Sequence, residues 1–557
     1  MSLSLLLTTI LKHYTEGPPG KSWDLKFHLS VAALKNDDRM LKLSIEEARK
    51  QFDQYIGQVK DPSNAVVKEV VLDERYRQKS RIYLEKVLKQ YEDVLDEKWK
   101  EPSDGLHGEW VYTKEESKNN EFDKVILHMH GGGYFLGTPK SERILTSICS
   151  GHTKARVLSI DYRLSPEHQF PAALCDSVAA YLYLINPESD AGFKPINPKK
   201  IVFLGGSAGG GLILATLLFL RDAGLPLPGG AAALSPWVDL THSMPSFLDA
   251  EVDKADIVPK ILGFRKIGPS SPIADEYIAN AKALSDKIAQ KKPNIVSHPS
   301  FTEIPQIQLY CANEALAIPY VSPMLAESLG DLPPILCQVG GFESFRDETI
   351  LFSHKAANPH EYQLPSYATK NFKKSPFKNP TKVMLEVYDE MPHAWHLFTF
   401  SKHSQIAFER CCSFINRVTS MEGENTSMID LFKEDVASSS VSISPSFIAM
   451  RIGTNGEIKE LNETDRDCLK WDKIGVVPKE NSSTSALLEL HENTSSNEVS
   501  AIIHADNIIN VQPHSIVIWH STDIASEFVN ILNAQYEPLQ YQLFFSHGTP
   551  KWYSNNL

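Results

Sequence analysis

The stretch that decides the fold is Ile201-Val-Phe-Leu-Gly-Gly-Ser-Ala-Gly-Gly-Gly-Leu-Ile-Leu-Ala-Thr216. Its apolar, partly β-branched start, 201–204, predicts a buried strand, and the Ala- and Leu-rich run 212–220 predicts a buried helix. Between them, residues 205–209 match the pattern G-x-S-x-G. A serine at a sharp strand-to-helix turn sits in a strained backbone, and the flanking glycines let strand and helix approach closely. The pattern predicts that Ser207 is a nucleophile at a helix N-terminus, where free N–H groups can stabilise an oxyanion.

Strand and helix patterns alternate on both sides of this stretch. Strands interleaved with helices imply an α/β fold, with a mostly parallel sheet covered by helices on both faces. The predicted strands are 109–112, 124–129, 156–162, 201–204, 230–234, 334–339 and 382–388, and the predicted helices include 171–185, 212–220 and 404–418.

Composition sets outer limits on class and partners. The chain has 557 residues, more than one ordinary domain, and a formal net charge of -13, which argues against nucleic-acid binding. Its 7 cysteines are scattered and odd in number, as expected for reduced thiols in an intracellular protein. No paired metal-ligand spacing occurs, so we expect no metal.

The remaining segments predict the domain organisation. Residues 22–100 read as mainly helical, and 241–332 read as an insertion over the C-terminal edge of the sheet, where such folds bind ligands. The core is then 101–240 and 333–418. Residues 419–557 form a C-terminal extension, partly flexible, with a hairpin at 446–461 and a strand followed by a helix within 514–533.

The N-terminal segment 2–12 places Leu3, Leu6, Leu7, Ile10 and Leu11 on one helical stripe. It is too short to span a bilayer, which needs about 20 residues. One interpretation is a helix packed on the protein body, and the other is an interfacial helix on a lipid surface.

A second glycine-rich segment, His130-Gly-Gly-Gly133, follows a predicted strand. Glycines there allow backbone N–H groups to point into a site without side chains in the way. The N–H groups of Gly132, Gly133 and Ala208 are therefore expected to bind the oxyanion of a tetrahedral intermediate.

The acid and base should follow the serine in that order. Two loops at the ends of later strands supply candidates, and His393 is the predicted base, with His396 as the alternative. Glu343 is the predicted acid that orients it. Asp347 competes, but its neighbour Arg346 indicates a local ion pair.

Five motifs together resemble the hormone-sensitive-lipase-like branch of the α/β hydrolases, in its fungal type with a long C-terminal extension. They are HGGGYFLG, DYRLSPEHQFPAAL, GGSAGG, YVSPMLAESLGDLPPILCQVGGFESFRDE and MPHAW. The resemblance spans roughly 109–418 and implies the α/β-hydrolase fold with a helical cap, which here would be built from 1–100 and 241–332. It also implies Ser207 as nucleophile, Glu343 as acid, His393 as base, and an oxyanion hole of Gly132, Gly133 and Ala208. The family hydrolyses carboxylic esters, often of acyl glycerols, sterols or small aryl alcohols, without a metal or organic cofactor.

Three features depart from the family pattern. Gly206 stands where the family usually has Asp, the acid is Glu rather than the commoner Asp, and the interval between acid and base is long. The excess, 357–380, is interpreted as a surface excursion, or alternatively as a segment whose lysines meet an anionic membrane. These lysines are Lys370, Lys373, Lys374 and Lys378.

The sequence therefore predicts a serine esterase or lipase acting on a lipid, steryl or aryl ester through an acyl-enzyme. A non-catalytic ligand receptor on the same fold and an acyltransferase using the same acyl-enzyme are the alternatives. We expect a cytoplasmic location, with peripheral contact to a membrane such as the ER or to a lipid droplet as a further hypothesis.

Overall fold

The structure is a computed structural model that falls into two units, Met1–Ile474 and Gly475–Leu557. It describes residues 3–35, 43–95, 97–116, 124–258, 270–291, 308–362, 364–365, 368, 374–420 and 442–469, and strands between 487 and 530. Lys370 and Lys373 of the lysine-rich loop lie outside the described residues, so the membrane hypothesis for that loop stays a prediction.

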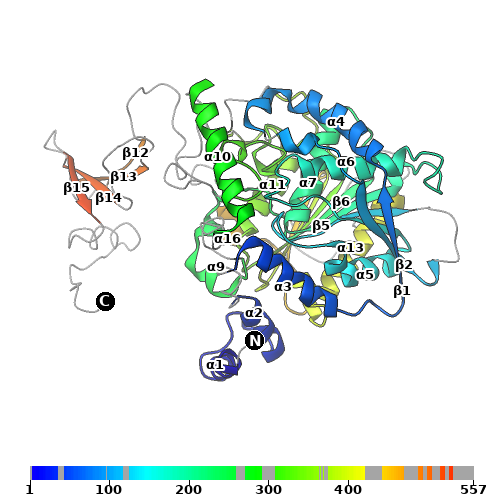
Figure 1. Ribbon diagram of the computed structural model, residues 1–557. Coiled ribbons are helices and arrows are strands. Elements are labelled where there is room, and N and C mark those ends of the chain that lie inside the picture. Colours follow the sequence, from blue (N-terminus) through cyan, green and yellow to red (C-terminus); the bar gives the residue numbers. More distant parts are fainter. Residues whose placement is uncertain are drawn as a thin grey trace. The chain divides into compact units, whose positions relative to one another are not determined.

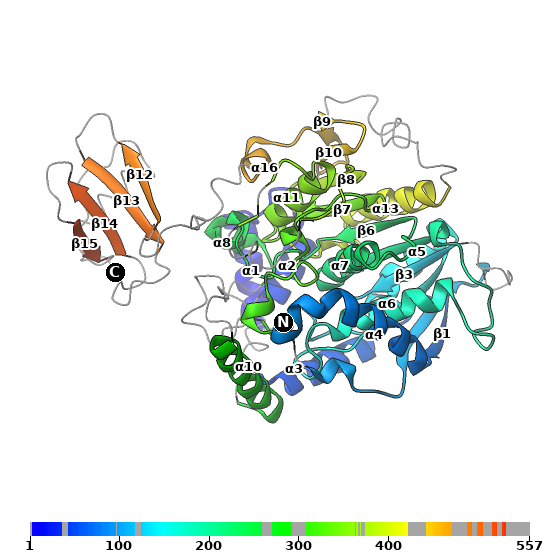
Figure 2. The ribbon, with the colours of Figure 1, turned by 90° about the horizontal axis from the view of Figure 1, so that it is seen from above.

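An 11-stranded sheet organises the first unit, with the order β1-β2-β4-β3-β5-β6-β7-β8-β10-β11 and β9 paired to β10 (Figures 1 and 2). From β4 to β10 every neighbouring pair is parallel, whereas β1–β2 and β2–β4 are antiparallel. The mostly parallel sheet predicted from the sequence is confirmed. The strands are β1 Ala65–Leu72, β2 Leu106–Thr113, β3 Val125–Met129, β4 Arg156–Ile160, β5 Ile201–Gly206, β6 Gly230–Leu234, β7 Ile335–Gly340, β8 Val383–Tyr388, β9 Ser442–Ile443, β10 Phe447–Ile452 and β11 Ile458–Lys459.

Helices cover both faces of this sheet, as predicted. α6 (Ala172–Ile185), α7 (Ala208–Asp222) and α11 (Arg346–Ala357) bury one face, while α5 (Arg143–Thr153) and α13 (Lys402–Ser420) bury the other (Figure 1). Alternate residues of one strand serve the two cores: Phe203 points into the first, and Val202 and Leu204 into the second.

Two segments extend the sheet beyond the predicted core. Residues 22–100 were expected to be mainly helical, but 65–72 form β1, which pairs with β2 along its whole length. The predicted core ended at residue 418, whereas β10 continues the sheet as the parallel partner of β8. The predicted hairpin at 446–461 is confirmed by β10 and β11, with Gly456 at φ 87° in the turn between them.

A buried ion cluster ties the N-terminal region to the core. Helix α4 (Glu74–Leu88) packs on α6. Arg77 of α4 donates from Nε to Asp176 of α6 at 2.6 Å, and Arg163 reaches the same carboxylate at 2.9 Å. Asp176 is fully buried. This carboxylate therefore compensates two guanidinium groups inside the protein.

Further helices come from the segments expected to form the cap. The N-terminal ones are α1 (Leu3–Thr15), α2 (Leu25–Lys35) and α3 (Ile45–Gln58), and the insertion supplies α8 (Pro245–Leu248), α9 (Ala250–Ala255) and α10 (Pro272–Lys291). α1 packs on α2. Just before α2, Trp23 Nε1 donates to the Glu390 carbonyl oxygen at 2.8 Å, and Phe27 meets Phe398 edge to face. The N-terminal helix pair is thereby anchored to the loop that follows β8.

The second unit contains a four-stranded antiparallel sheet in the order β12-β13-β14-β15. Its strands are β12 Leu487–Glu492, β13 Glu498–His504, β14 Ser515–His520 and β15 Ser526–Asn530. The predicted strand within 514–533 is confirmed. The predicted helix after it is wrong, because 526–530 pair with β14 as a strand.

Candidate active site

The serine of the G-x-S-x-G pattern lies at the turn between β5 and α7. Ser207 adopts φ 54° and ψ -123°, a strained backbone conformation for a residue with a side chain. A Cβ on Gly205 would approach the Gly209 carbonyl oxygen to 2.5 Å, and one on Gly209 would overlap the Met129 carbonyl oxygen. Strand and helix are therefore too close for larger residues, which is the close approach that the sequence predicted.

Three predicted side chains form one hydrogen-bonded chain. His393 Nε2 lies 2.8 Å from Ser207 Oγ, and His393 Nδ1 lies 2.7 Å from Glu343 Oε1. The second oxygen of Glu343 accepts from the Gly340 N–H at 2.8 Å and from Ser235 Oγ at 2.9 Å. Ser207 follows β5, Glu343 follows β7 and His393 follows β8. The carboxyl ends of these parallel strands lie at the same edge of the sheet and bring the three residues together.

Burial and charge shift the acid–base properties of this pair. Burial alone lowers the pKa of His393, but attraction and hydrogen bonding to Glu343 outweigh it and hold the pKa above its ordinary value. Burial raises the pKa of Glu343, against the opposing effect of His393. The pair therefore favours a protonated imidazole more than an exposed histidine does.

The two alternative residues occupy other positions. His396 is buried, packs against the ring of Trp395 at a tilted angle and places Nε2 3.1 Å from Gln338 Oε1. Burial lowers its pKa to about 3. Asp347 pairs with Arg346 at 2.8 Å, the local ion pair that the sequence indicated. Neither residue is part of the chain from Ser207 to Glu343.

The glycine run after β3 has the backbone expected of an oxyanion loop. Gly132 and Gly133 have φ values of 118° and 61°. Within the described residues, neither N–H group donates to another protein atom. Ala208 begins α7, so its N–H has no acceptor inside the helix. The three predicted N–H donors are thus available to a bound oxygen.

Two buried carboxylates beside the site were missed by the sequence analysis. Glu142 accepts from the Gly131 N–H at 2.6 Å and lies 2.9 Å from His128 Nε2. Asp256, in the insertion, accepts from backbone N–H groups next to the predicted acid and base. No sequence spacing predicts these two carboxylates, because Glu142 and Asp256 each bond a loop that only the folded chain brings into contact with them.

Two kinds of feature are absent from the described part of the chain. No group of three or more His, Cys, Asp and Glu side chains there is arranged to hold a metal ion. No helix among the described residues is long and apolar enough to cross a membrane.

Comparison with known proteins finds similarity to proteins of one fold. The alpha/beta hydrolase fold family matches residues 126–264. An acetyl-hydrolase of Streptomyces hygroscopicus is 29% identical over 49% of this chain and 69% of its own length. An arylesterase of Saccharolobus solfataricus is 37% identical over 44% of this chain and 65% of its own.

A solved esterase of the bacterial hormone-sensitive lipase family is 24% identical, with a TM-score of 0.45, and the match covers 70% of this chain and 97% of that structure. The segments shared with the acetyl-hydrolase and the arylesterase make up about two thirds of the length of these relatives. The family match shows the α/β-hydrolase fold, and the names of the relatives indicate a carboxylic ester hydrolase, as the motifs that resemble the hormone-sensitive-lipase-like branch predict.

Proposed function

We propose that the chain is a serine esterase or lipase that works through an acyl-enzyme on Ser207. The observation that carries this proposal is the continuous chain of short contacts from Ser207 Oγ through His393 to Glu343. Glu343 Oε1 accepts the Nδ1–H of His393, which leaves the lone pair of Nε2 directed at the serine hydroxyl. This is the tautomer that a general base requires.

The reaction follows from this arrangement in two halves. Ser207 Oγ attacks the ester carbonyl carbon while His393 Nε2 takes its proton, and the N–H groups of Gly132, Gly133 and Ala208 stabilise the oxyanion. The intermediate collapses, and the alcohol leaves with the proton from His393. Water then attacks the acyl carbon with the same histidine as base, which releases the carboxylic acid and restores Ser207.

The substrate class is proposed from the relatives together with the family resemblance. Relatives named acetyl-hydrolase and arylesterase favour a short acyl chain, an aryl alcohol, or both. The resemblance to lipid-acting members favours a lipid or steryl alcohol. We therefore propose acetyl esters of aryl and steryl alcohols as the first substrates to test.

The test compares wild type with Ser207→Ala on p-nitrophenyl esters from short to long acyl chains and on a steryl acetate. Ser420→Ala, at an exposed position on α13, is the matched control. Wild type and Ser420→Ala should hydrolyse at least one ester, and Ser207→Ala should lose the activity with an unchanged melting temperature. Hydrolysis that survives in Ser207→Ala would refute the assignment.

Adding an acceptor alcohol to the same assay separates hydrolase from acyltransferase. Both use the acyl-enzyme, so only the partition of the acyl group between water and alcohol distinguishes them. We propose that water is the main acceptor. An acyl ester as the major product at low alcohol concentration would contradict this.

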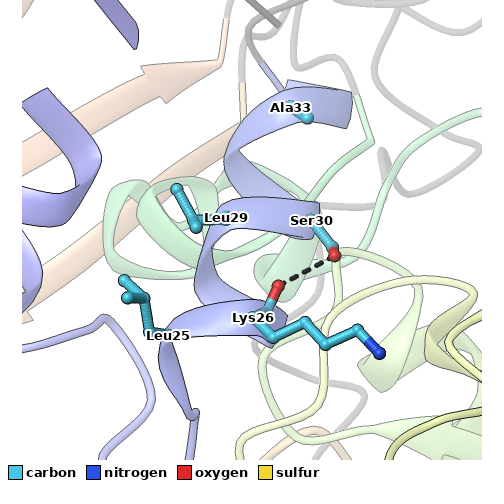
Figure 3. A pocket seen from close by; sticks show the side chains of 5 residues that line it. All are labelled: Leu25, Lys26, Leu29, Ser30 and Ala33. Carbon is cyan, nitrogen blue, oxygen red and sulfur yellow. Dashed lines mark hydrogen bonds between the residues drawn. The ribbon is translucent and has the colours of Figure 1, made fainter. Parts of the chain in front are cut away.

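A specific surface supports peripheral contact with lipid. Leu3, Leu7, Leu11 and Tyr14 form an exposed apolar stripe on α1, each more than half exposed. On α2, the side chains of Leu25, Leu29 and Ala33, with Lys26 and Ser30, line an open hollow of about 500 Å³ (Figure 3).

Charge at this surface favours an anionic lipid. On and next to the two helices, three exposed lysines (Lys12, Lys21 and Lys26) outnumber two exposed carboxylates (Glu16 and Asp24), although the whole chain carries a net charge of -13. Apolar residues beside lysines suit an anionic lipid surface. We propose that α1 and α2 bind such a surface, which would bring the site to a lipid ester.

Vesicle sedimentation tests the lipid contact. Wild type should sediment with vesicles of phosphatidylserine and phosphatidylcholine, and the triple variant Leu3→Ser, Leu7→Ser, Leu11→Ser should remain in solution. Ile82→Ser removes an equally exposed apolar residue from α4 and is the matched control. Equal sedimentation of the triple variant and wild type would refute the contact and leave the esterase proposal untouched.

A further inference from the structure

Asp256 is a buried carboxylate in the insertion, directly after α9 and 1% exposed. Its Oδ1 accepts from the backbone N–H of His393 at 2.7 Å and from that of Ile257 at 2.8 Å. Its Oδ2 accepts from the backbone N–H of Ser344 at 2.8 Å. One side chain therefore receives hydrogen bonds from three separate N–H donors.

Two of these donors flank the proposed acid–base pair. Ser344 follows Glu343 in the loop after β7, and His393 lies in the loop after β8. Charge-assisted hydrogen bonds are about twice as strong as neutral ones, so the carboxylate holds both loops more firmly than an amide would. The separation of the two loops fixes the contact between His393 Nδ1 and Glu343.

We propose that Asp256 is a positioning residue for the His393–Glu343 pair, so that the insertion itself holds the catalytic geometry. The proposal rests on the proposed function, because it assigns Asp256 a part in the reaction of Ser207. The residue touches no reacting atom. It acts through the backbone of the two loops and through its charge.

The charge of Asp256 also acts on the titration of the pair. Titratable groups that face His393 are Glu343, Asp256 and His396. Asp256 adds to the attraction by which Glu343 keeps the pKa of His393 above its ordinary value, against the lowering effect of burial. On its other side, Asp256 and Asp253 attract the ammonium of Lys35 at the end of α2.

Removing this charge should therefore alter both geometry and pH dependence. Hydrolysis needs neutral His393, so activity is lost as pH falls through the pKa of that residue. Without the Asp256 charge the pKa of His393 falls, and the acid limb of kcat/KM should move to lower pH. A purely structural residue would not move this limb.

The test compares Asp256→Asn and Asp256→Glu with Asp253→Asn, a matched control that removes a charge from the neighbouring helix. Kinetics use a soluble p-nitrophenyl ester that wild type hydrolyses, and the rate of Ser207 labelling by a fluorophosphonate reports base positioning without that ester. Asp256→Asn should lower kcat and the labelling rate about ten- to a hundredfold with KM nearly unchanged, and should move the acid limb to lower pH. Asp253→Asn should behave as wild type.

Asp256→Glu separates charge from geometry and covers the case in which Asp256→Asn does not fold. It keeps the charge at a longer reach, so kcat should fall while the acid limb stays nearer to that of wild type. Wild-type kcat, labelling rate and acid limb in Asp256→Asn would overturn the proposal, as would wild-type kcat in Asp256→Glu. A failure of the esterase proposal would give a different result: Ser207→Ala would still hydrolyse the ester, whatever the activities of the Asp256 variants.

Discussion

Glu343→Gln tests the proposed acid with the smallest change of shape. The carboxylate of Glu343 accepts from three donors: His393 Nδ1 on one oxygen, and Gly340 N–H and Ser235 Oγ on the other. A glutamine has only one oxygen to offer. If that oxygen faces His393, the amide N–H₂ meets the Gly340 N–H, and two donors oppose each other in a buried site.

The magnitude follows from these contacts. An unsatisfied buried donor costs about 1–3 kcal/mol, so the glutamine oxygen should turn toward Gly340 and leave its N–H₂ on His393 Nδ1. The histidine then carries its proton on Nε2 and cannot accept one from Ser207. Loss of the charged hydrogen bond to the imidazolium costs a further 1.5–3 kcal/mol or so. Together these terms predict a fall in kcat of roughly 10²- to 10⁴-fold.

The assay is the pH profile of ester hydrolysis, with Asp347→Asn as the control carboxylate. Since attraction to Glu343 raises the pKa of His393 against the effect of burial, the residual activity of Glu343→Gln should have its acid limb at lower pH than wild type. A melting curve checks that the variant is folded.

Two results would refute this reasoning. One is a kcat for Glu343→Gln within a few fold of wild type in a folded protein. The other is a large loss of kcat in Asp347→Asn with Glu343→Gln unaffected, which would make Asp347 the acid despite its pairing with Arg346.

Three further predictions concern the oxyanion loop and the core. Glu142→Gln should lower kcat about tenfold in p-nitrophenyl ester hydrolysis, because a charged acceptor holds the Gly131 N–H at 2.6 Å. Gly132→Ala should lower kcat at least about a hundredfold, because φ is 118° and a Cβ would overlap the Leu136 carbonyl oxygen in the loop that presents an oxyanion donor. Asp176→Asn should lower the free energy of unfolding, measured in urea at pH 7, by about 3–5 kcal/mol, because it leaves two buried guanidinium groups without their carboxylate. Burial raises the pKa of Asp176, but the two arginines outweigh this and lower it, so the stabilisation should be present above the ordinary pKa of aspartate and disappear as pH falls through the lowered value.

Two matched variants serve as controls for these predictions. Gly151→Ala adds a methyl group in a nearby helix with only an ordinary contact at 3.7 Å, and should keep wild-type kcat. Asp190→Asn breaks an exposed pair with Arg75 and should leave the free energy of unfolding nearly unchanged. Equal losses of stability in Asp176→Asn and Asp190→Asn would contradict the role of the buried cluster, and unchanged kcat in Glu142→Gln would contradict the anchoring of the loop.

The central strands and the three-residue chain were predictable because their signals are local. Parallel strands buried on both faces read as continuous apolar runs, and those at β3, β5, β7 and β8 end in the loops that carry the predicted site residues. The choice of Glu343 over Asp347 as the acid also rested on a local signal. Arg346 is next to Asp347 in the sequence, and the structure contains the ion pair between them.

The elements that were missed lack such local signals. β1 is an edge strand, which pairs with β2 alone among the described strands. Lys68 and Glu69 interrupt the apolar pattern of its sequence, and charged residues are common in edge strands. In the segment around Phe528 and Val529, the apolar spacing suits a helix as well as a strand, and pairing with β14 decides it. Asp256 depends on contacts with distant loops that no spacing encodes.

The position of β10 has a consequence for how the protein is made. Because β10 pairs with the outer side of β8, that edge of β8 remains uncovered on the ribosome until residue 452 has been synthesised. A chain expressed only to residue 418 would leave the backbone of β8 open to pairing with other molecules, a route to aggregation. Arg451 of β10 further bonds Asp465 at 2.6 Å and Asp389, which follows β8, also at 2.6 Å. The catalytic unit is therefore best expressed with residues up to at least 469.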